Sequence, residues 1–182
     1  MTTQEEFQKV MSDCRRLFID KMYDYGTAWR ILRPASLTDQ IFIKANRIRT
    51  LQETQESLVD EGITPEFVGI VNYSLMGLIQ LELDLSVDGR DLSNERAEEL
   101  YDKHADECLQ LMLRKNHDYG EAWRSMRVSS FTDIILQKVL RTKQIEDLNG
   151  KTRVSEGIAA NYMDMLNYAC FALIKLTIEN EK

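Results

Sequence analysis

One charged and aromatic motif occurs twice in the sequence, as KMYDYGTAWR at residues 21–30 and as KNHDYGEAWR at residues 115–124. Both copies hold a lysine, an aspartate, a tyrosine, a glycine, a tryptophan and an arginine in the same order. Lysine and arginine suit a phosphate, aspartate suits a hard cation such as Mg²⁺, and an indole can stack on a base. Because the polar residues are copied along with the apolar ones, the pattern favours two related binding sites.

The lysine and the aspartate of this motif lie near the end of a predicted helix. Lys21 and Lys115 fall on the apolar stripe of their helices, and Asp24 and Asp118 follow three residues later, in the last turn. A carboxylate there opposes the helix dipole, at a cost of about 0.3–1 kcal/mol when exposed. We therefore expect a cation beside each aspartate: a lysine, an arginine or a metal ion. The candidates for substrate binding are Lys21, Asp24, Tyr25, Trp29, Arg30, Arg33, Lys115, Tyr119, Trp123, Arg124, Arg127, Lys138, Arg141 and Asn167.

The third predicted helix of the second half adds acidic candidates. It reads NYMDMLNY over residues 161–168 where the first half has EFVGIVNY, so Asp164 aligns with Gly69 and Asn161 with Glu66. Asp164 is expensive to bury unless it is paired or bound to a metal ion. We therefore expect the more complete site in the second half, with Mg²⁺ as the preferred ion. The candidate catalytic and metal-binding residues are Asp118, Glu156 and Asp164.

Each of these assignments has a structural alternative that the sequence leaves open. In that alternative the lysines, aspartates and arginines form a buried network that fixes helix ends. The tryptophans then anchor the core, and the pairs Lys44 with Arg47 and Lys138 with Arg141 belong to a solvated face instead of binding phosphate.

The motif is part of an internal duplication. An offset of 94 positions aligns residues 14–47 with 108–141, and sixteen of those 34 pairs are identical. A one-residue insertion near residue 150 changes the offset to 95, and Asn72-Tyr73 then aligns with Asn167-Tyr168. Self-similarity over this length sets the organisation of the chain. We predict a first repeat at residues 1–84, a connector at 85–93 and a second repeat at 94–182, joined in one compact domain.

The apolar residues of both repeats recur at steps of three and four, which predicts helices. No stretch alternates with period two. We therefore predict an all-α bundle of two tandem homologous three-helix units with pseudo-twofold symmetry, either a monomer with a pseudo-dimeric core or a homodimer. In the second unit the helices are expected at residues 94–119, 132–148 and 155–178, and Gly26 is expected to cap the first helix of the first unit.

Local signals set the other helix boundaries. Thr3 and Glu6 make a capping box at the start of the first helix. The second helix of each unit is expected to begin at a threonine and an aspartate, residues 38–39 and 132–133, with Asp39 and Asp133 as N-caps. The third helix of the first unit is expected to begin at residues 64–66, with proline at its first position.

The composition excludes several classes of protein. Of the 182 residues, 43% are apolar and 29% charged, and the net charge of −7 argues against duplex nucleic acid as a partner. The N-terminus lacks a signal peptide, and the apolar runs are shorter than the roughly 20 residues of a membrane span. We expect a cytoplasmic protein without a membrane partner. Its cysteines form no CxxC pair, so buried reduced thiols are expected at Cys14, Cys108 and Cys170.

Two motifs resemble the nucleotide modification associated domain 1 family, which was long known only as a domain of unknown function. They are KxxDYGxAWR in both repeats and DMLNYA at residues 164–169, and the first repeat departs from the second motif at Gly69. The resemblance covers nearly the whole chain as two tandem copies and implies a role around modified nucleotides, without an established reaction. A more distant likeness is to the all-α nucleoside triphosphate pyrophosphatases, which are helical, oligomeric and Mg²⁺-dependent.

Two functions remain at this point. The first is a protein that binds or processes a small-molecule nucleotide, in which basic and aromatic residues hold phosphate and base while Asp118, Glu156 and Asp164 place Mg²⁺. The alternative is a non-catalytic helical interaction or structural module whose duplicated charges form a buried ion-pair network. The sequence has no glycine-rich phosphate loop, GxSxG or HExxH motif. His104 and His117 do not repeat, so a histidine-based site is not expected.

Overall fold

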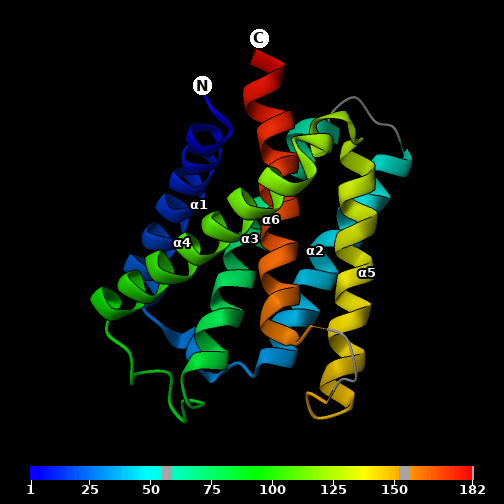
Figure 1. Ribbon diagram of the computed structural model, residues 1–182. Helices are drawn as coiled ribbons and strands as arrows, with labels where there is room; N and C mark the ends of the chain where they lie inside the picture. Colours follow the sequence, from blue (N-terminus) through cyan, green and yellow to red (C-terminus); the bar gives the residue numbers. More distant parts are fainter. Residues whose placement is uncertain (55–58, 152–155, 182) are drawn as a thin grey trace.

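The computed structural model describes residues 1–54, 59–151 and 156–181, and over these residues it is all-α, without a strand (Figure 1). The predicted fold class is confirmed. A 3-10 turn joins the first helix to the second in each unit, at Ala28–Ile31 and Ala122–Ser125. The long helices are α1 (Thr3–Tyr25), α2 (Pro34–Thr54), α3 (Val59–Glu82), α4 (Asn94–Tyr119), α5 (Val128–Asp147) and α6 (Ile158–Leu173).

The two halves pack as a pseudo-twofold pair. Helices α2, α3, α5 and α6 form a four-helix core, α1 and α4 lie side by side against it, and both chain ends lie at the same end of the bundle (Figure 1). Two ion pairs between the halves repeat this symmetry: Asp39 with Lys143 at 2.8 Å, and Asp133 with Arg49 at 2.7 Å. One continuous apolar core takes residues from all these helices, so each unit completes the core of the other.

Helix α1 begins one residue earlier than the sequence predicts. Thr2 is its N-cap, with φ −74° and ψ 163°, and its hydroxyl accepts a hydrogen bond from the Glu5 backbone N–H while the Glu5 carboxylate accepts one from the Thr2 N–H. The capping box is therefore Thr2 with Glu5, and the prediction of Thr3 with Glu6 is wrong. The reason is that Glu6 is needed elsewhere, because it is 1% exposed and binds Arg124.

Helices α2 and α5 begin at Pro34 and Val128, about one turn before the predicted caps. The compact 3-10 turns complete the change of direction early, so the following residues are already helical. The Thr38 hydroxyl donates to the Pro34 carbonyl within α2 instead of accepting from a free N–H. Asp39 and Asp133 lie inside the helices and make the ion pairs between the halves, so their prediction as N-caps is wrong.

The third helices also differ from prediction at their starts. Helix α3 begins at Val59 and contains Pro65, which was predicted as the first helical residue. Helix α6 begins at Ile158, and the predicted start at residue 155 lies outside the described residues. At its other end α6 continues into a π-helical turn, Ile174–Ile178, and a final 3-10 turn, Glu179–Glu181.

Helix α3 is more apolar over its whole length than the short apolar runs in the sequence suggested. In the part of the chain that the structure describes, Gly62–Glu82 is long and apolar enough to cross a membrane, with a mean hydropathy of 1.2 over the best window. The window average tolerates polar residues such as Asn72 and Gln80, which interrupt the apolar runs. Of that window 61% is buried inside the bundle, as expected for a central core helix.

The cysteines are buried and free, as predicted. Cys14, Cys108 and Cys170 are 0% exposed and form no disulfide. Burial raises the pKa of the Cys14 thiol to about 12, so this thiol stays protonated at neutral pH.

Two equivalent asparagines show how the duplicated core has diverged. Asn72 on α3 donates to the Cys14 carbonyl, and Asn167 on α6 donates to the Cys108 carbonyl, at 3.1 and 3.2 Å. The Oδ1 atom of Asn72 also accepts a hydrogen bond from the Tyr101 hydroxyl at 2.8 Å, whereas Oδ1 of Asn167 is buried without a partner in the described chain. The position equivalent to Tyr101 is Phe7, which has no hydroxyl to donate.

This difference predicts opposite effects for two single-atom changes. Phe7→Tyr should raise the free energy of unfolding by about 0.5–1.5 kcal/mol, because the added hydroxyl can donate to Asn167. Tyr101→Phe should lower it by about 1–3 kcal/mol, because Asn72 then keeps a buried acceptor without a donor. Urea denaturation of both variants with equal m-values would measure the two changes. A loss of stability in Phe7→Tyr would contradict the equivalence of the two positions.

Candidate functional site

In each half of the described chain an open cavity lies between the end of the first helix, the 3-10 turn and the third helix. The cavity of the first unit has a volume of about 380 Å³ and that of the second about 400 Å³. Both fall in the range of roughly 300–1,000 Å³ that is typical of small-molecule sites. Their walls share equivalent pairs: Lys21 and Lys115, Tyr25 and Tyr119, Trp29 and Trp123, Asn72 and Asn167, and Tyr73 and Tyr168.

The repeated glycine shapes both cavities. Gly26 and Gly120 end α1 and α4 with φ of +64° and +63°, a region that favours glycine. A Cβ atom at either position would meet nothing within 4 Å, so the backbone angle, not space, requires glycine there. This turn brings Trp29 and Trp123 back against the helix that precedes them. The C-cap predicted at Gly26 is confirmed by its N–H bond to the Met22 carbonyl at 2.8 Å.

In the second unit a buried carboxylate lies at the cavity wall. Asp164 on α6 is 5% exposed, and its two oxygens bind Lys115 at 2.8 Å and Lys138 at 3.1 Å. Burial lowers the pKa of Lys115, but the hydrogen bond to Asp164 and the charges of Asp164, Tyr168 and Glu156 outweigh burial, so the pKa is raised overall. The partner that a buried Asp164 requires is thus supplied by two lysines.

In the first unit the buried carboxylate lies one helical turn earlier, at Glu66. It is 7% exposed and lies 3.2 Å from Lys44 and 3.7 Å from Arg47. Gly69 aligns with Asp164, and a Cβ atom at Gly69 would lie 3.2 Å from Cε of Lys44. The hydrocarbon chain of Lys44 therefore crosses the glycine to reach Glu66. Lys21 lines this cavity and makes no ion pair with the side chains that the structure describes.

The indole nitrogens of both tryptophans lack a partner. Nε1 of Trp29 and Nε1 of Trp123 are buried, and neither donates a hydrogen bond within the described chain. Both tryptophans line a cavity. A buried donor without a partner costs about 1–3 kcal/mol, so its appearance at the same place in both units calls for an explanation.

The faces of the Trp123 indole are already in contact with neighbouring side chains. Phe171 stacks on it with ring centroids 4.3 Å apart and an interplanar angle of 8°, and the Arg124 guanidinium carbon lies 4.4 Å from its centroid. These contacts fix the ring, so a base stacked on Trp123 would have to displace one of them. Trp29 is packed more loosely, with the Phe18 ring 6.1 Å away and tilted by 58°.

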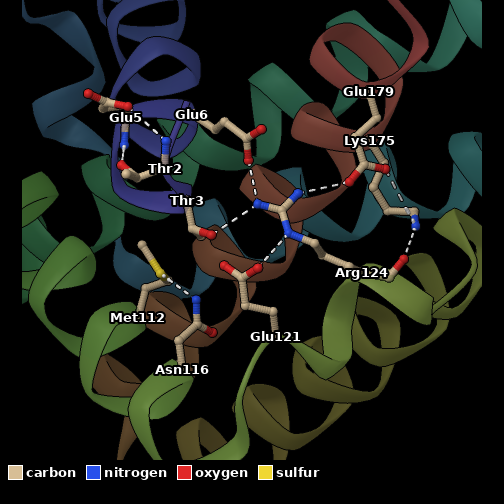
Figure 2. A network of polar contacts seen from close by, with 10 residues as sticks. All are labelled: Thr2, Thr3, Glu5, Glu6, Met112, Asn116, Glu121, Arg124, Lys175 and Glu179. Atoms are coloured by element: carbon tan, nitrogen blue, oxygen red, sulfur yellow. Dashed lines mark hydrogen bonds and ion pairs between the residues drawn. The ribbon is translucent and has the colours of Figure 1, made fainter. Parts of the chain in front are cut away.

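The repeated arginines are held in ion-pair networks outside the cavity linings. The Arg124 guanidinium binds Thr3 and Glu6 of α1, Glu121, and Glu179 near the C-terminus, and the Lys175 ammonium donates to the Arg124 carbonyl (Figure 2). Arg124 thereby ties the second unit to the first helix of the first unit. Arg30 is 1% exposed and binds the Gln80 side chain, the Asp84 carbonyl and Asp91, which lies 3.0 Å away.

The structure does not bring the three candidate metal-binding residues together. Asp164 binds the two lysines, Asp118 is exposed with its carboxylate 3.3 Å from Nδ1 of His117, and Glu156 is exposed before α6. No group of three His, Cys, Asp or Glu side chains suited to a metal ion occurs in the described chain. A hard cation at Asp164 would have to displace both ammonium groups.

The remaining candidates lie around the cavities or outside them. Tyr25 and Tyr119 are 76% and 78% exposed and line the two cavity walls. Asp24, Arg33 and Arg127 are exposed and do not line a cavity, and Arg141 lies half-buried on α5 after Lys138. Sequence reasoning missed Tyr73 and Tyr168 as lining residues, although the repeated Asn-Tyr dipeptide contained that signal.

These features define a class of protein: an all-α bundle of two tandem units, each with its own ligand-sized cavity. The chain belongs to the nucleotide modification associated domain 1 family, whose model matches residues 21–81 and 115–176. The two matches start at the repeated lysine and span most of each cavity wall, which confirms the family resemblance and the two tandem copies. No curated protein and no solved structure matches the chain.

Burial predicts an order of stability among variants of the Asp164 cluster. Asp164→Asn should lower the free energy of unfolding by about 1–2 kcal/mol, because the lysine side chains are 45% and 29% exposed and remain hydrated. Lys115→Met with Lys138→Met should cost about 3–5 kcal/mol, because the carboxylate is 6% exposed and loses both cations. Urea denaturation at pH 7 would measure both.

Adding Asp164→Asn to the lysine double variant is the matched control, since it removes the uncompensated charge and should restore most of the loss. If Asp164→Asn proved more destabilising than the lysine double variant, the cluster would not work as its distances and burial indicate.

Proposed function

We propose that the protein binds nucleosides or nucleotides, with one ligand in the cavity of each unit. The observation that carries this proposal is the pair of equivalent cavities, each with a buried indole N–H that has no partner in the described chain and with a lysine at its wall. A nucleobase has acceptor atoms along its edge for such an N–H, and a lysine suits the phosphate. The family description, which refers to nucleotide modification, supports the same class of ligand.

The residue types of the walls fit a planar ligand with a polar edge. Beside the lysine and the tryptophan, each cavity has two tyrosines, an asparagine and apolar residues such as Met76 or Phe171. Apolar walls with a few fixed polar groups are typical of small-molecule sites. Because Phe171 and Arg124 contact the Trp123 ring, we place the base against its N–H edge and not stacked on its face.

A thermal-shift screen of the full-length protein tests this proposal. The ligands are nucleosides and their mono-, di- and triphosphates, including base-modified forms, each with and without Mg²⁺. A ligand at about 100 times its Kd stabilises the folded state by about 2.7 kcal/mol, which raises Tm by about 5–10 °C for a chain of this size. Trp29→Phe with Trp123→Phe removes both N–H donors and should weaken binding about tenfold.

Tyr23→Phe is the matched control, because Tyr23 lies in the same motif but is 87% exposed and lines neither cavity. Its Tm shift should equal that of the wild type. The proposal is abandoned if no nucleoside or nucleotide shifts Tm and calorimetry also detects no binding.

The comparison with and without Mg²⁺ in this screen also tests Mg²⁺-dependent phosphate chemistry at Asp118, Glu156 and Asp164. We assign no metal-dependent step to these residues, because their carboxylates do not converge and Asp164 is neutralised by two lysines. A metal ion that arrives with a bound triphosphate would act through the phosphates. It would appear as tighter binding of di- and triphosphates when Mg²⁺ is present.

The second candidate function is a non-catalytic helical module in which the repeated charges are structural. The observation that favours it is that Arg30 and Arg124 are bound to protein groups and join elements far apart in the chain. Figure 2 shows this for Arg124. Under this alternative, arginine substitutions lower Tm and no nucleotide raises it. The ligand screen therefore separates the two candidates.

A further inference from the structure

The two units contain the same kinds of charge in different places. Each unit has an equivalent lysine on its first helix, an equivalent lysine on its second helix and one buried carboxylate on its third helix. What differs is the position of that carboxylate, which is Glu66 in the first unit and Asp164, one turn later in the aligned helix, in the second. The two units have the same types of charged residue, so the position of the carboxylate on the third helix determines which charge a ligand meets.

In the second unit the carboxylate neutralises the lysine at the cavity wall. Lys115 lies 2.8 Å from Asp164. An anion that approached Lys115 would either have to break this ion pair or lie next to a buried carboxylate of the same sign. Both are unfavourable, because like charges interact strongly where solvent is partly excluded.

In the first unit the wall lysine keeps its charge available. Glu66 also lines this cavity, but it lies one turn away, 3.2 Å from Lys44 and 3.7 Å from Arg47, and Gly69 has no side chain to offer at the level of Lys21. Lys21 makes no ion pair with the described side chains and lines the cavity beside Trp29, whose N–H is also without an acceptor in the described chain. The positive charge of Lys21 is therefore available to a ligand in this cavity.

The two asparagines at the cavity walls also differ in their hydrogen bonds. In the first cavity both polar atoms of Asn72 are occupied, by the Cys14 carbonyl and the Tyr101 hydroxyl. In the second, Oδ1 of Asn167 is a buried acceptor without a partner among the described residues. Its orientation is fixed, because the other amide atom donates to the Cys108 carbonyl.

We propose that the first cavity is selective for phosphorylated ligands, with Lys21 in contact with the phosphate, and that the second cavity selects against phosphate. This inference rests on the proposed nucleotide binding and specifies which unit takes the charged ligand. The selectivity is produced by the one-turn displacement of the buried carboxylate on the third helix.

Exchange of the two arrangements tests the inference without a change in net charge. Glu66→Asn with Gly69→Asp gives the first unit the residues of the second, and Asn161→Glu with Asp164→Gly gives the second unit those of the first. The nearest atoms to a Cβ atom at position 69 belong to the flexible side chain of Lys44, which can move. Calorimetry on the full-length chain would compare each nucleoside with its 5′-monophosphate and with inorganic phosphate.

The wild type should bind the monophosphate at least tenfold more tightly than the nucleoside. Glu66→Asn/Gly69→Asp should lose this preference, and Asn161→Glu/Asp164→Gly should gain a second phosphate-selective site. Lys21→Met should also lose the preference, and since Lys21 is exposed this variant tests the contact even if an exchange variant does not fold. Lys9→Met is the matched control, because it removes an exposed lysine from the same helix outside the cavity.

The outcomes separate this inference from the proposed function. Nucleotide binding whose preference for phosphate survives both Glu66→Asn/Gly69→Asp and Lys21→Met overturns the inference and leaves the proposed function in place. Binding of inorganic phosphate that depends on Lys21, without binding of any nucleoside or nucleotide, supports the phosphate site and overturns the proposed function. Equal affinity of the wild type for nucleoside and monophosphate overturns the inference as well.

Discussion

A buried carboxylate on the third helix of each unit is the constraint on which the polar arrangement depends. An uncompensated carboxylate is too costly to bury, so each one requires a cation, and the second helix of the same unit supplies a lysine in both cases. Asp164 takes Lys138 and Lys115, whereas Glu66 takes Lys44 and Arg47. The position of the carboxylate therefore decides whether the lysine of the first helix is used within the protein or left for a ligand.

The frame around this ion pair is the same in both units, while its polar contacts have diverged. The positive φ of Gly26 and Gly120 and the 3-10 turns place the tryptophans alike. The arginines that follow them have different partners: Arg30 binds the end of α3 and the connector, and Arg124 binds α1 and the C-terminal turn. Divergence at these polar positions leaves the apolar core shared by the two units in place.

Much of the fold could be read from the sequence, because helical periodicity and a duplication of this length are strong signals. Helix starts were less predictable, since Thr38 and Asp39 have the chemistry of a cap but lie inside α2. The sequence showed that Asp164 needs a partner but not that lysines would supply it. It also suggested a cation beside Asp24 and Asp118, which instead face solvent, where the dipole penalty is small. Alignment gives equivalence of positions and not the direction of side chains, such as the path of Lys44 across Gly69.

Fusion of two units into one chain allows the two sites to change independently, which the two sites of a homodimer cannot do. In an isologous dimer a substitution changes both sites at once, because they are the same surface used twice. In this chain Gly69 and Asp164 differ although their units share one core, and so do Phe7 and Tyr101. The difference between Gly69 and Asp164 changes one cavity wall and leaves the other unchanged. Fusion therefore allows both units to keep the glycine turns and tryptophans that shape the cavities while the charged contacts of each unit change independently.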